Sequence, residues 1–332
     1  MLAVMLSIRG RRLSDSAGGV ESKEIFQERP SQIAWRRLKR NKVALTGAII
    51  AAFFVVLAFG APIITSLFGV NNSTTYQNVL AQDGIPLHGW NGISIHHPFG
   101  FEPGTGRDLF ALMLYGSRIS FTVAVLAGFS FIAIGLVLGT TAAYLGGWVD
   151  NAFGRIADFL LSFPVTFFFI ALSTPLVLSI EHWGIAQNNG ARVIVLVSVL
   201  TFFSWPGFFR VIRSQVLSIR EKEFVLASRA LGASKRRIIF REILPNVWST
   251  AIIYLTISLP GFLGAEAAYS FLGVGVQAPG TTWGLTLSDA TNYWQRDPVY
   301  LAIPAGMIII VVLSLNLFGD GLRDALDSKS DR

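Results

Sequence analysis

Apolar residues gather in six long stretches of the chain, separated by polar segments that carry most of the charge. Each stretch reaches or exceeds the roughly 20 residues that a helix needs to cross a bilayer. A backbone inside lipid must satisfy its own hydrogen bonds, which favours helices. The alternation of period two that would indicate a β-barrel is absent from these stretches. The sequence therefore predicts an all-α membrane protein with six transmembrane helices. The stretches run from Val43 to Leu67, Ile119 to Leu145, Ile156 to Ile180, Val193 to Ile212, Val247 to Leu272 and Val299 to Phe318.

Lysine and arginine are distributed unevenly among the polar segments. Ten of the 27 precede Val43, and nine more lie between Arg210 and Arg241, whereas the segments after the first, third and fifth stretches carry few. Basic residues concentrate in the cytoplasmic loops of membrane proteins. We therefore expect both termini and residues 218–245 on the cytoplasmic side, and the three segments poor in cations outside.

The composition agrees with a membrane protein, since 52% of the residues are hydrophobic and 14% are charged. The net charge of +7 does not indicate nucleic-acid binding, because the cations cluster beside apolar stretches. The chain has no cysteine, which excludes disulfides, iron–sulfur clusters and cysteine-ligated zinc. The first apolar stretch is too long for a cleaved signal and is expected to remain as an anchor.

Residues 31–42 combine Ile33, Trp35 and Leu38 with five cations. This pattern predicts an amphipathic helix on the inner membrane surface, or a plain positive stop that orients the first span. The expected units are a cytoplasmic tail with this helix (1–42), a first transmembrane helix (43–67), an extracytoplasmic segment (68–117), a five-helix core (118–318) and a cytoplasmic tail (319–332).

The segment 218–245 is a polar, strongly basic island between the fourth and fifth stretches. Residues 219–231 contain neither Gly nor Pro and predict one helix, which Gly232 ends. A second helix is predicted from Ser234, whose hydroxyl suits an N-cap, to Ile243, with a stop at Leu244–Pro245. Such a hairpin suits docking into a groove on another protein, and equally suits a position at the lipid headgroups. The residues alone leave both interpretations open.

The residues around Gly232 resemble the EAA loop of permease subunits of binding-protein-dependent ABC importers. The likeness is carried by Ala227, Ser228 and Gly232, followed thirteen residues after the glycine by Pro245. The wording EFVLASRALGASKRRIIFREILPN is similar to the second permease subunit of the oligopeptide, dipeptide and nickel branch. In that family the loop forms coupling helices that sit in a cleft of the ATPase.

The segment departs from the motif at its first position, where Leu226 stands in place of the name-giving Glu. Glu223 lies three residues earlier, on a neighbouring helical face, and is not a simple replacement. We therefore expect apolar docking through Leu226. The candidate coupling residues are Glu223, Leu226, Ala227, Ser228, Arg229, Gly232, Ala233 and Pro245.

A second likeness to the same branch precedes the second apolar stretch. The segment HPFGFEPGTGRDLFALMLYGSRIS resembles the family's Gly-Thr-Asp, Gly-Arg-Asp and Tyr-Gly-x-Arg-x-Ser series, with an altered order in 100–105. The likeness runs, with gaps, from Ala34 to Asp327, and it implies a type I ABC importer transmembrane fold with cytoplasmic coupling helices. The matching residues are Gly106, Arg107, Asp108, Tyr115, Gly116, Arg118 and Ser120.

Two carboxylates fall inside the predicted spans. Asp158 is near the start of the third, and Glu266 is toward the outer end of the fifth. A carboxylate at membrane depth is costly and indicates a cavity or a partner. Glu266 is thus a candidate residue of the transport path or its gate; the alternative is a residue hydrogen-bonded within the helix bundle.

Three of the four histidines, His88, His96 and His97, lie in the segment 68–117. Adjacent histidines outside the membrane could ligate a metal, and a nickel-importing branch of the family makes this idea relevant. No fixed spacing with carboxylates accompanies them. We therefore predict no metal site.

The chain contains no phosphate-binding loop of the form G-x-x-x-x-G-K-[ST]. The resemblance implies a non-catalytic subunit of an ATP-driven importer in the bacterial inner membrane, with ATP and Mg bound by partner ATPases. The implied partners are a homologous permease, two ABC ATPases, an extracytoplasmic binding protein and membrane lipid.

The resemblance implies short peptides as substrates, with nickel or another small solute as the alternative. An ion-coupled secondary transporter is a rival interpretation. It would be expected to show paired internal repeats and several buried charges, and the sequence shows neither.

Overall fold

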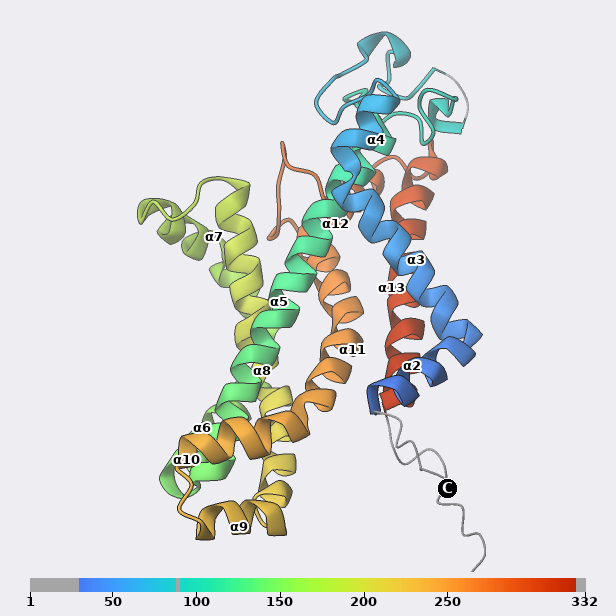
Figure 1. Ribbon diagram of the computed structural model, residues 1–332. Coiled ribbons are helices and arrows are strands. Elements are labelled where there is room, and N and C mark those ends of the chain that lie inside the picture. Colours follow the sequence, from blue (N-terminus) through green and yellow to red (C-terminus); the bar gives the residue numbers. More distant parts are fainter. Residues whose placement is uncertain (1–29, 88–89, 327–332) are drawn as a thin grey trace, which may run out of the picture.

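The computed structural model describes residues 30–87 and 90–326, and these residues form a bundle of long helices (Figure 1). Six helical segments are long and apolar enough to cross a membrane, which confirms the predicted all-α class. They are α3 (Lys42–Phe59), α5 (Leu109–Leu145), α7 (Val165–His182), α8 (Asn189–Ile219), α11 (Leu244–Phe271) together with the helical turns before it, and α13 (Pro298–Leu326).

Shorter elements connect the long helices. Two single turns, η1 and η2, lie in the segment between α4 and α5, and the π-helical η3 precedes α11. Their bounds are α2 (Pro30–Arg40), α4 (Ala61–Leu67), η1 (Gln77–Val79), η2 (Trp90–Gly92), α6 (Gly147–Leu161), α9 (Glu223–Ala230), α10 (Lys235–Arg237), η3 (Ile238–Ile243) and α12 (Trp283–Ala290).

Helix α5 is the centre of the bundle, because it packs against α3, α8 and α11. Its closest neighbour is α8, which approaches at Gly135 and Gly139. A Cβ atom at Gly139 would lie 2.9 Å from the Cβ of Ile212 and 3.1 Å from the carbonyl oxygen of Phe209. Two glycines four residues apart thus allow the two helix backbones to meet, as is usual for helices packed in membranes.

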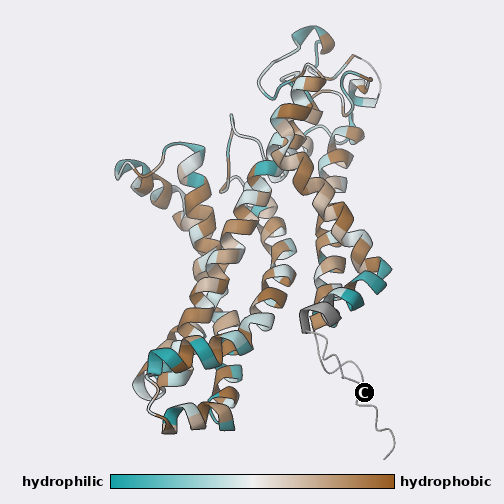
Figure 2. Cartoon of the chain, in the orientation of Figure 1, coloured by the Kyte–Doolittle hydropathy of each residue, from teal (hydrophilic) through white to brown (hydrophobic). Residues whose placement is uncertain are grey.

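The two ends of the bundle differ in character. The segment 68–108 and α12 cover one end, and α6, α9 and α10 lie at the opposite end (Figure 1). Apolar residues follow the long helices, and polar residues gather at α2, at α10 and in the segment between α4 and α5 (Figure 2). This distribution fits a chain whose middle lies in lipid and whose ends lie in water.

The predicted first and second spans have the wrong bounds. The first was expected to continue to Leu67, but α3 ends at Phe59 and α4 starts again at Ala61. Pro62 in the first turn of α4 has no N–H to donate to the preceding helix, which explains the break. Helix α5 begins ten residues earlier than predicted, because the carboxylate of Asp108 caps it by accepting from the Ala111 N–H at 2.7 Å.

The predicted third span, Ile156–Ile180, is two helices. Helix α6 ends at Leu161, and α7 begins after Pro164 at its N-cap position. Pro164 fixes its own backbone and disfavours helical geometry in the residue before it. Asp158 therefore lies on α6, which is not among the six candidate spans, and its side chain is exposed at the end of the bundle that carries α9.

The predicted stop at Pro245 is also wrong. Residues 235–271 form one continuous helical segment, with a π-helical stretch at Ile238–Ile243 immediately before α11. Pro245 occupies the first turn of α11, and the Asn246 side chain donates to the Glu242 carbonyl at 2.6 Å. The wider π turn accommodates a proline that would otherwise clash with the preceding carbonyls. The second arm of the hairpin is consequently continuous with a spanning helix.

The amphipathic helix predicted for 31–42 is present as α2. Leu38 is buried in a small cluster with Ala44 and Ala325, which belongs to α13, while Trp35 is exposed. The Lys39 ammonium lies 5.0 Å from the centre of the Trp35 ring. This helix therefore joins the two ends of the described chain at one side of the bundle.

The close packing of α5 and α8 predicts the effect of added side-chain volume. Replacing a free helical glycine by alanine stabilises a helix by about 0.5–1 kcal/mol. At Gly135 the added Cβ would lie 2.8 Å from Phe208, and at Gly139 it would meet Ile212. We expect G135A/G139A to lower the melting temperature of the purified protein in detergent, at a cost of about 1–3 kcal/mol for overpacking.

The matched control is G261A/G264A on α11, where no atom lies within 4 Å of either added Cβ. This double variant should melt at or above the wild-type temperature. Equal melting temperatures for the two double variants would show that α5 and α8 do not meet through glycine.

Candidate functional site

The hairpin of α9 and α10 contains seven of the eight residues predicted for coupling. Helix α9 ends at Ala230, and Gly232 has a φ of +77°, a left-handed conformation that glycine adopts without strain. Ser234 then caps α10 by accepting from the Arg237 N–H at 3.3 Å. The predicted glycine turn and N-cap are confirmed, whereas the helix predicted over 219–231 is shorter: Ile219 ends α8, residues 220–222 form a turn, and α9 begins at Glu223. Glu223, Leu226, Ala227, Ser228 and Arg229 lie on α9, Gly232 and Ala233 lie in the turn, and Pro245 lies apart, in α11.

The hairpin presents an apolar and cationic surface to solvent. Within α9 only Val225 is buried, and Ile238 and Ile243 are buried nearby in the π-helical stretch. Leu226 is 42% exposed, and Leu231 in the turn is 89% exposed. Isolated exposed apolar residues are common, but two exposed leucines on one short hairpin suit contact with another protein.

Two arginines join the hairpin to the end of α5. Arg220, between α8 and α9, donates to the Ala143 carbonyl at 2.7 Å, and this carbonyl belongs to the last turn of α5. The Arg229 guanidinium lies 5.9 Å from the centre of the Tyr144 ring. A carbonyl at a helix C-terminus lacks an intrahelical partner, so the contact from Arg220 satisfies it. A displacement of α9 therefore acts on α5 as well as α8.

Helix α6 is held to α8 by two arginine–carboxylate pairs. Arg213 donates to both oxygens of Asp150, at 2.5 and 2.7 Å, and Arg210 pairs with Asp158. The hydrogen bonds from Arg213 lower the pKa of the Asp150 carboxyl. Sequence reasoning missed this connection; the signal for it was a pair of aspartates eight residues apart in a segment with apolar residues on one face.

Glu266 is fully buried between α5 and α11. The Ser120 hydroxyl donates to one carboxylate oxygen at 2.5 Å, and the Ser270 hydroxyl donates to the other at 2.8 Å. The contact from Ser120 joins α5 to α11, and the contact from Ser270 lies within α11. This geometry is what the alternative interpretation expects, a carboxylate that is hydrogen-bonded within the helix bundle. The gate role of Glu266 stays a prediction.

A polar cluster joins the segment 68–108 to the end of the bundle. Arg107 donates to both oxygens of the buried Glu102, at 2.6 and 2.9 Å. The Tyr300 hydroxyl lies 2.9 Å from the Asp289 carboxylate, to which it donates, and 3.3 Å from Glu102. Burial raises the pKa of the Asp289 carboxyl, while the hydrogen bond from Tyr300 opposes the shift. The motif residue Arg107 thus has a structural partner in Glu102, which in turn accepts from Tyr300 of α13.

His97 is placed beside the start of α5. Its Nδ1 atom lies 2.6 Å from the Asp108 carboxylate, whose other oxygen caps α5. His88 lies outside the described residues. Among the described residues, no group of three or more His, Asp or Glu side chains is arranged to hold a metal ion.

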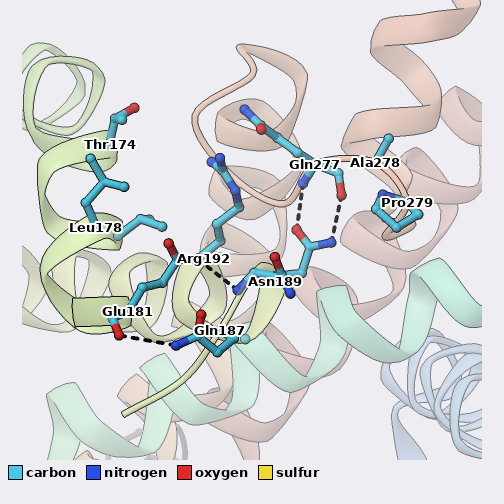
Figure 3. A pocket seen from close by; sticks show the side chains of 12 residues that line it. Thr174, Leu178, Glu181, Gln187, Asn189, Arg192, Gln277, Ala278 and Pro279 are labelled. Carbon is cyan, nitrogen blue, oxygen red and sulfur yellow. Dashed lines mark hydrogen bonds between the residues drawn. The ribbon is translucent and has the colours of Figure 1, made fainter. Parts of the chain in front are cut away.

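Two of the cavities in the described part of the chain lie beside α7 and α8. One, of about 570 Å³, lies between α5, α7, α8 and α11 and is lined by aromatic rings, Ser204, Ser258 and two glycines. The other, of about 630 Å³, lies between the end of α7, the start of α8 and the loop that follows α11 (Figure 3). Glu181, Arg192 and Gln277 line the second cavity.

Comparison with protein families decides the class of this helical bundle. Residues 104–332 match the family described as binding-protein-dependent transport system inner membrane component, and residues 29–83 match the N-terminal transmembrane domain of oligopeptide transport permease C. The chain belongs to this permease family.

Characterised relatives match the permease over most of their length. The dipeptide transport system permease protein DppC of Alkalihalophilus pseudofirmus is 38% identical over 300 residues, which are 90% of each chain. The oligopeptide permease OppC of Haemophilus influenzae is 32% identical, over 93% of this chain and 90% of its own. The glutathione permease GsiD of Escherichia coli is 36% identical over 89% of both chains.

A solved structure shows the same fold. The MetNI methionine ABC transporter in an inward-facing conformation superposes with a TM-score of 0.51 at 19% identity, over 65% of this chain and 96% of that one. A second crystal form gives 0.50 at 20% identity, over 66% and 98%. The expected ABC importer permease fold is confirmed, and the permease is a multi-pass protein of the inner membrane.

The buried contacts of Glu266 predict different effects for two substitutions. Glu266→Gln keeps acceptor capacity for one hydroxyl and preserves the volume, whereas Glu266→Ala leaves a cavity and removes the acceptors of Ser120 and Ser270. A buried polar group without a partner costs about 1–3 kcal/mol. We expect E266A to melt clearly below E266Q in thermal unfolding of the purified complex.

Uptake measured on the same samples tests the gate role. Normal transport by E266Q would leave Glu266 with a packing role only. Loss of transport by E266Q without loss of stability would support a function on the path.

Proposed function

We propose that this permease forms one half of the membrane channel of an ATP-driven importer for short peptides, and that α9 and α10 receive the motion of the ATPases. Family membership supports the importer, and the names of the relatives, for dipeptides, oligopeptides and glutathione, support the substrate class. The other half of the channel would be a homologous permease, and an extracytoplasmic binding protein would deliver the peptide.

The observation that carries the coupling role is the connection between the exposed hairpin and three spanning helices. Helix α9 follows α8 after a turn of three residues, and α10 continues through η3 into α11 without a break. Arg220 and Arg229 add contacts to the end of α5. A force on the hairpin surface therefore reaches α5, α8 and α11 together.

The mechanism is a rigid-body switch between two states of the complex. Closure of the ATPases around ATP would draw the two coupling hairpins together, and α8 and α11 would tilt with them. Because α5, α8 and α11 surround the cavity that contains Ser204 and Ser258, their tilt changes its access to the two sides of the membrane. ATP and Mg bind to the partner ATPases, and this chain performs no chemistry on the peptide.

The orientation follows from the charge distribution. The cation-rich α2 and α9–α10 end would face the cytoplasm, with both termini on that side, and the segment 68–108 would face outward. The hairpin is then on the side where ATP is available, and the cavity beside Arg192 is on the side where a binding protein arrives.

The turn at Gly232 offers a selective test of coupling. Its left-handed backbone disfavours a β-branched residue by roughly 1–3 kcal/mol, although no atom lies within 4 Å of an added Cβ. Gly232→Val is expected to reduce ATP-dependent peptide uptake into reconstituted vesicles by about tenfold. The complex should still assemble in the membrane, because Gly232 makes no packing contact of its own.

The matched control is Gly232→Asn, since asparagine enters the left-handed region more readily than other side chains. It should retain most of the uptake. Wild-type uptake by the valine variant would overturn the coupling role. Peptide uptake by the wild-type chain without any ATPase would overturn the ATP-driven importer itself.

A further inference from the structure

The cavity beside the start of α8 has the size and shape of a ligand site. Its volume of about 630 Å³ falls within the range of roughly 300–1,000 Å³ that is usual for small-molecule pockets. Figure 3 shows Glu181 on the α7 side, Gln277 and Pro279 on the loop side, and Arg192 between them. The cavity is lined by the end of α7 and the start of α8, and these parts of the two helices lie away from the end of the bundle that carries α9 and α10 (Figure 1).

The loop wall of this cavity is fixed by main-chain contacts. The Asn189 side-chain nitrogen donates to the Gln277 carbonyl at 2.8 Å, and its oxygen accepts from the Gln277 N–H at 3.0 Å. One amide group thus satisfies both main-chain atoms of a loop residue. The cavity is therefore formed before any ligand arrives, which limits the entropic cost of binding.

Arg192, in the first turn of α8, has most of its hydrogen-bonding capacity unused. A guanidinium has five N–H donors, and the side chain makes one long contact, of 3.5 Å, with the Gly275 carbonyl. None of the ion pairs in the described part of the chain includes Arg192. Its charge is available to a carboxylate, which a guanidinium can bind through two parallel hydrogen bonds.

Glu181, at the end of α7, supplies the opposite charge. One carboxylate oxygen accepts from the Asn188 N–H at 2.8 Å. The ion pairs formed between described residues do not include Glu181 either. A cation and an anion therefore line one cavity without neutralising each other.

A free short peptide carries the complementary pair of charges. Its α-carboxyl group, with a pKa of about 3.5, and its α-amino group, with a pKa of about 8, are both largely charged at pH 7. We propose that this cavity binds the two ends of a short peptide, with Arg192 on the carboxylate and Glu181 on the ammonium group. The inference rests on the proposed peptide-import function and adds a substrate subsite within the permease itself.

Direct binding to the permease–ATPase complex, purified without its binding protein, tests the subsite. Saturation-transfer NMR detects weak binding of three probes: dialanine, its C-terminal amide and its N-acetyl derivative. Arg192→Gln is expected to weaken dialanine binding by about tenfold, as for loss of a charge-assisted hydrogen bond, and to leave binding of the amide unchanged. Glu181→Gln retains an acceptor for the Asn188 N–H, and it should weaken binding of dialanine but not of the N-acetyl derivative.

The control variant is Arg296→Gln, which removes an exposed arginine near Asp83 that does not line this cavity. It should bind all three probes as the wild type does. Equal dialanine binding by the wild type and both cavity variants would overturn the subsite, as would a loss in R192Q that extends equally to the amide. No dialanine binding by the wild type would overturn it as well.

Uptake by the complete transporter separates this inference from the proposed function. If the wild type, with its binding protein and ATPases, imports no peptide, the proposed function fails and the subsite fails with it. If the wild type imports peptide and the two cavity variants bind and import it equally well, only the subsite fails.

Discussion

The close contact between α5 and α8 is the interaction on which the rest of the bundle depends. Because Gly135 and Gly139 have no side chains, α5 and α8 touch along their backbones. Arg213 and Arg220 then extend the contact beyond the membrane-spanning length, to α6 and to the last turn of α5. Helices α3, α7 and α11 pack onto this pair, so the pair positions both cavities and the hairpin.

The hairpin of α9 and α10 is connected differently to its two neighbouring long helices, α8 and α11. On one side, α9 joins α8 through a short non-helical turn that Arg220 holds against α5. On the other side, α10 reaches α11 through a helix that is only widened at Ile238–Ile243. Continuous helical hydrogen bonding transmits displacement along its axis better than a turn does. The π-helical stretch thus accommodates Pro245 without breaking the helix. A displacement of α10 can therefore pass to α11, whereas a break in the helix would weaken this transmission.

Local signals in the sequence predicted the elements whose cause is local. Gly232 ends α9 because its backbone is left-handed, and Ser234 caps α10, as their residue types indicate. Hydropathy found all six spanning segments but misplaced their ends, since apolar content does not register that Asp108 starts a helix or that Pro164 separates two. At Pro245 the rule that a proline ends a helix failed. The π turn before it removes the clash between the proline ring and the preceding carbonyls, and the residue types alone do not reveal such a turn.

Contacts between residues far apart in the chain could not be predicted from the sequence. Ser120 and Glu266 are 146 positions apart, and Arg213 and Asp150 are 63 apart, so neither pairing leaves a trace in local pattern. The resemblance to the permease family was sufficient to predict residues 218–245 as a candidate coupling hairpin. It gave no indication of the unpaired charges of Glu181 and Arg192, which become visible only when α7 and α8 are placed side by side.

The two hydrogen bonds between the Asn189 side chain and the main chain of Gln277 have a consequence for substitutions at position 277. The two hydrogen bonds from Asn189 are made to the peptide group of Gln277 and do not depend on the side chain at position 277, although the Gln277 side chain adds one more bond, to the Gly273 carbonyl. A substitution at position 277 would therefore change the chemistry at the mouth of the cavity and leave the two bonds from Asn189 in place. The side chain at the mouth of the cavity and the loop that holds it in place are thus partly independent of each other.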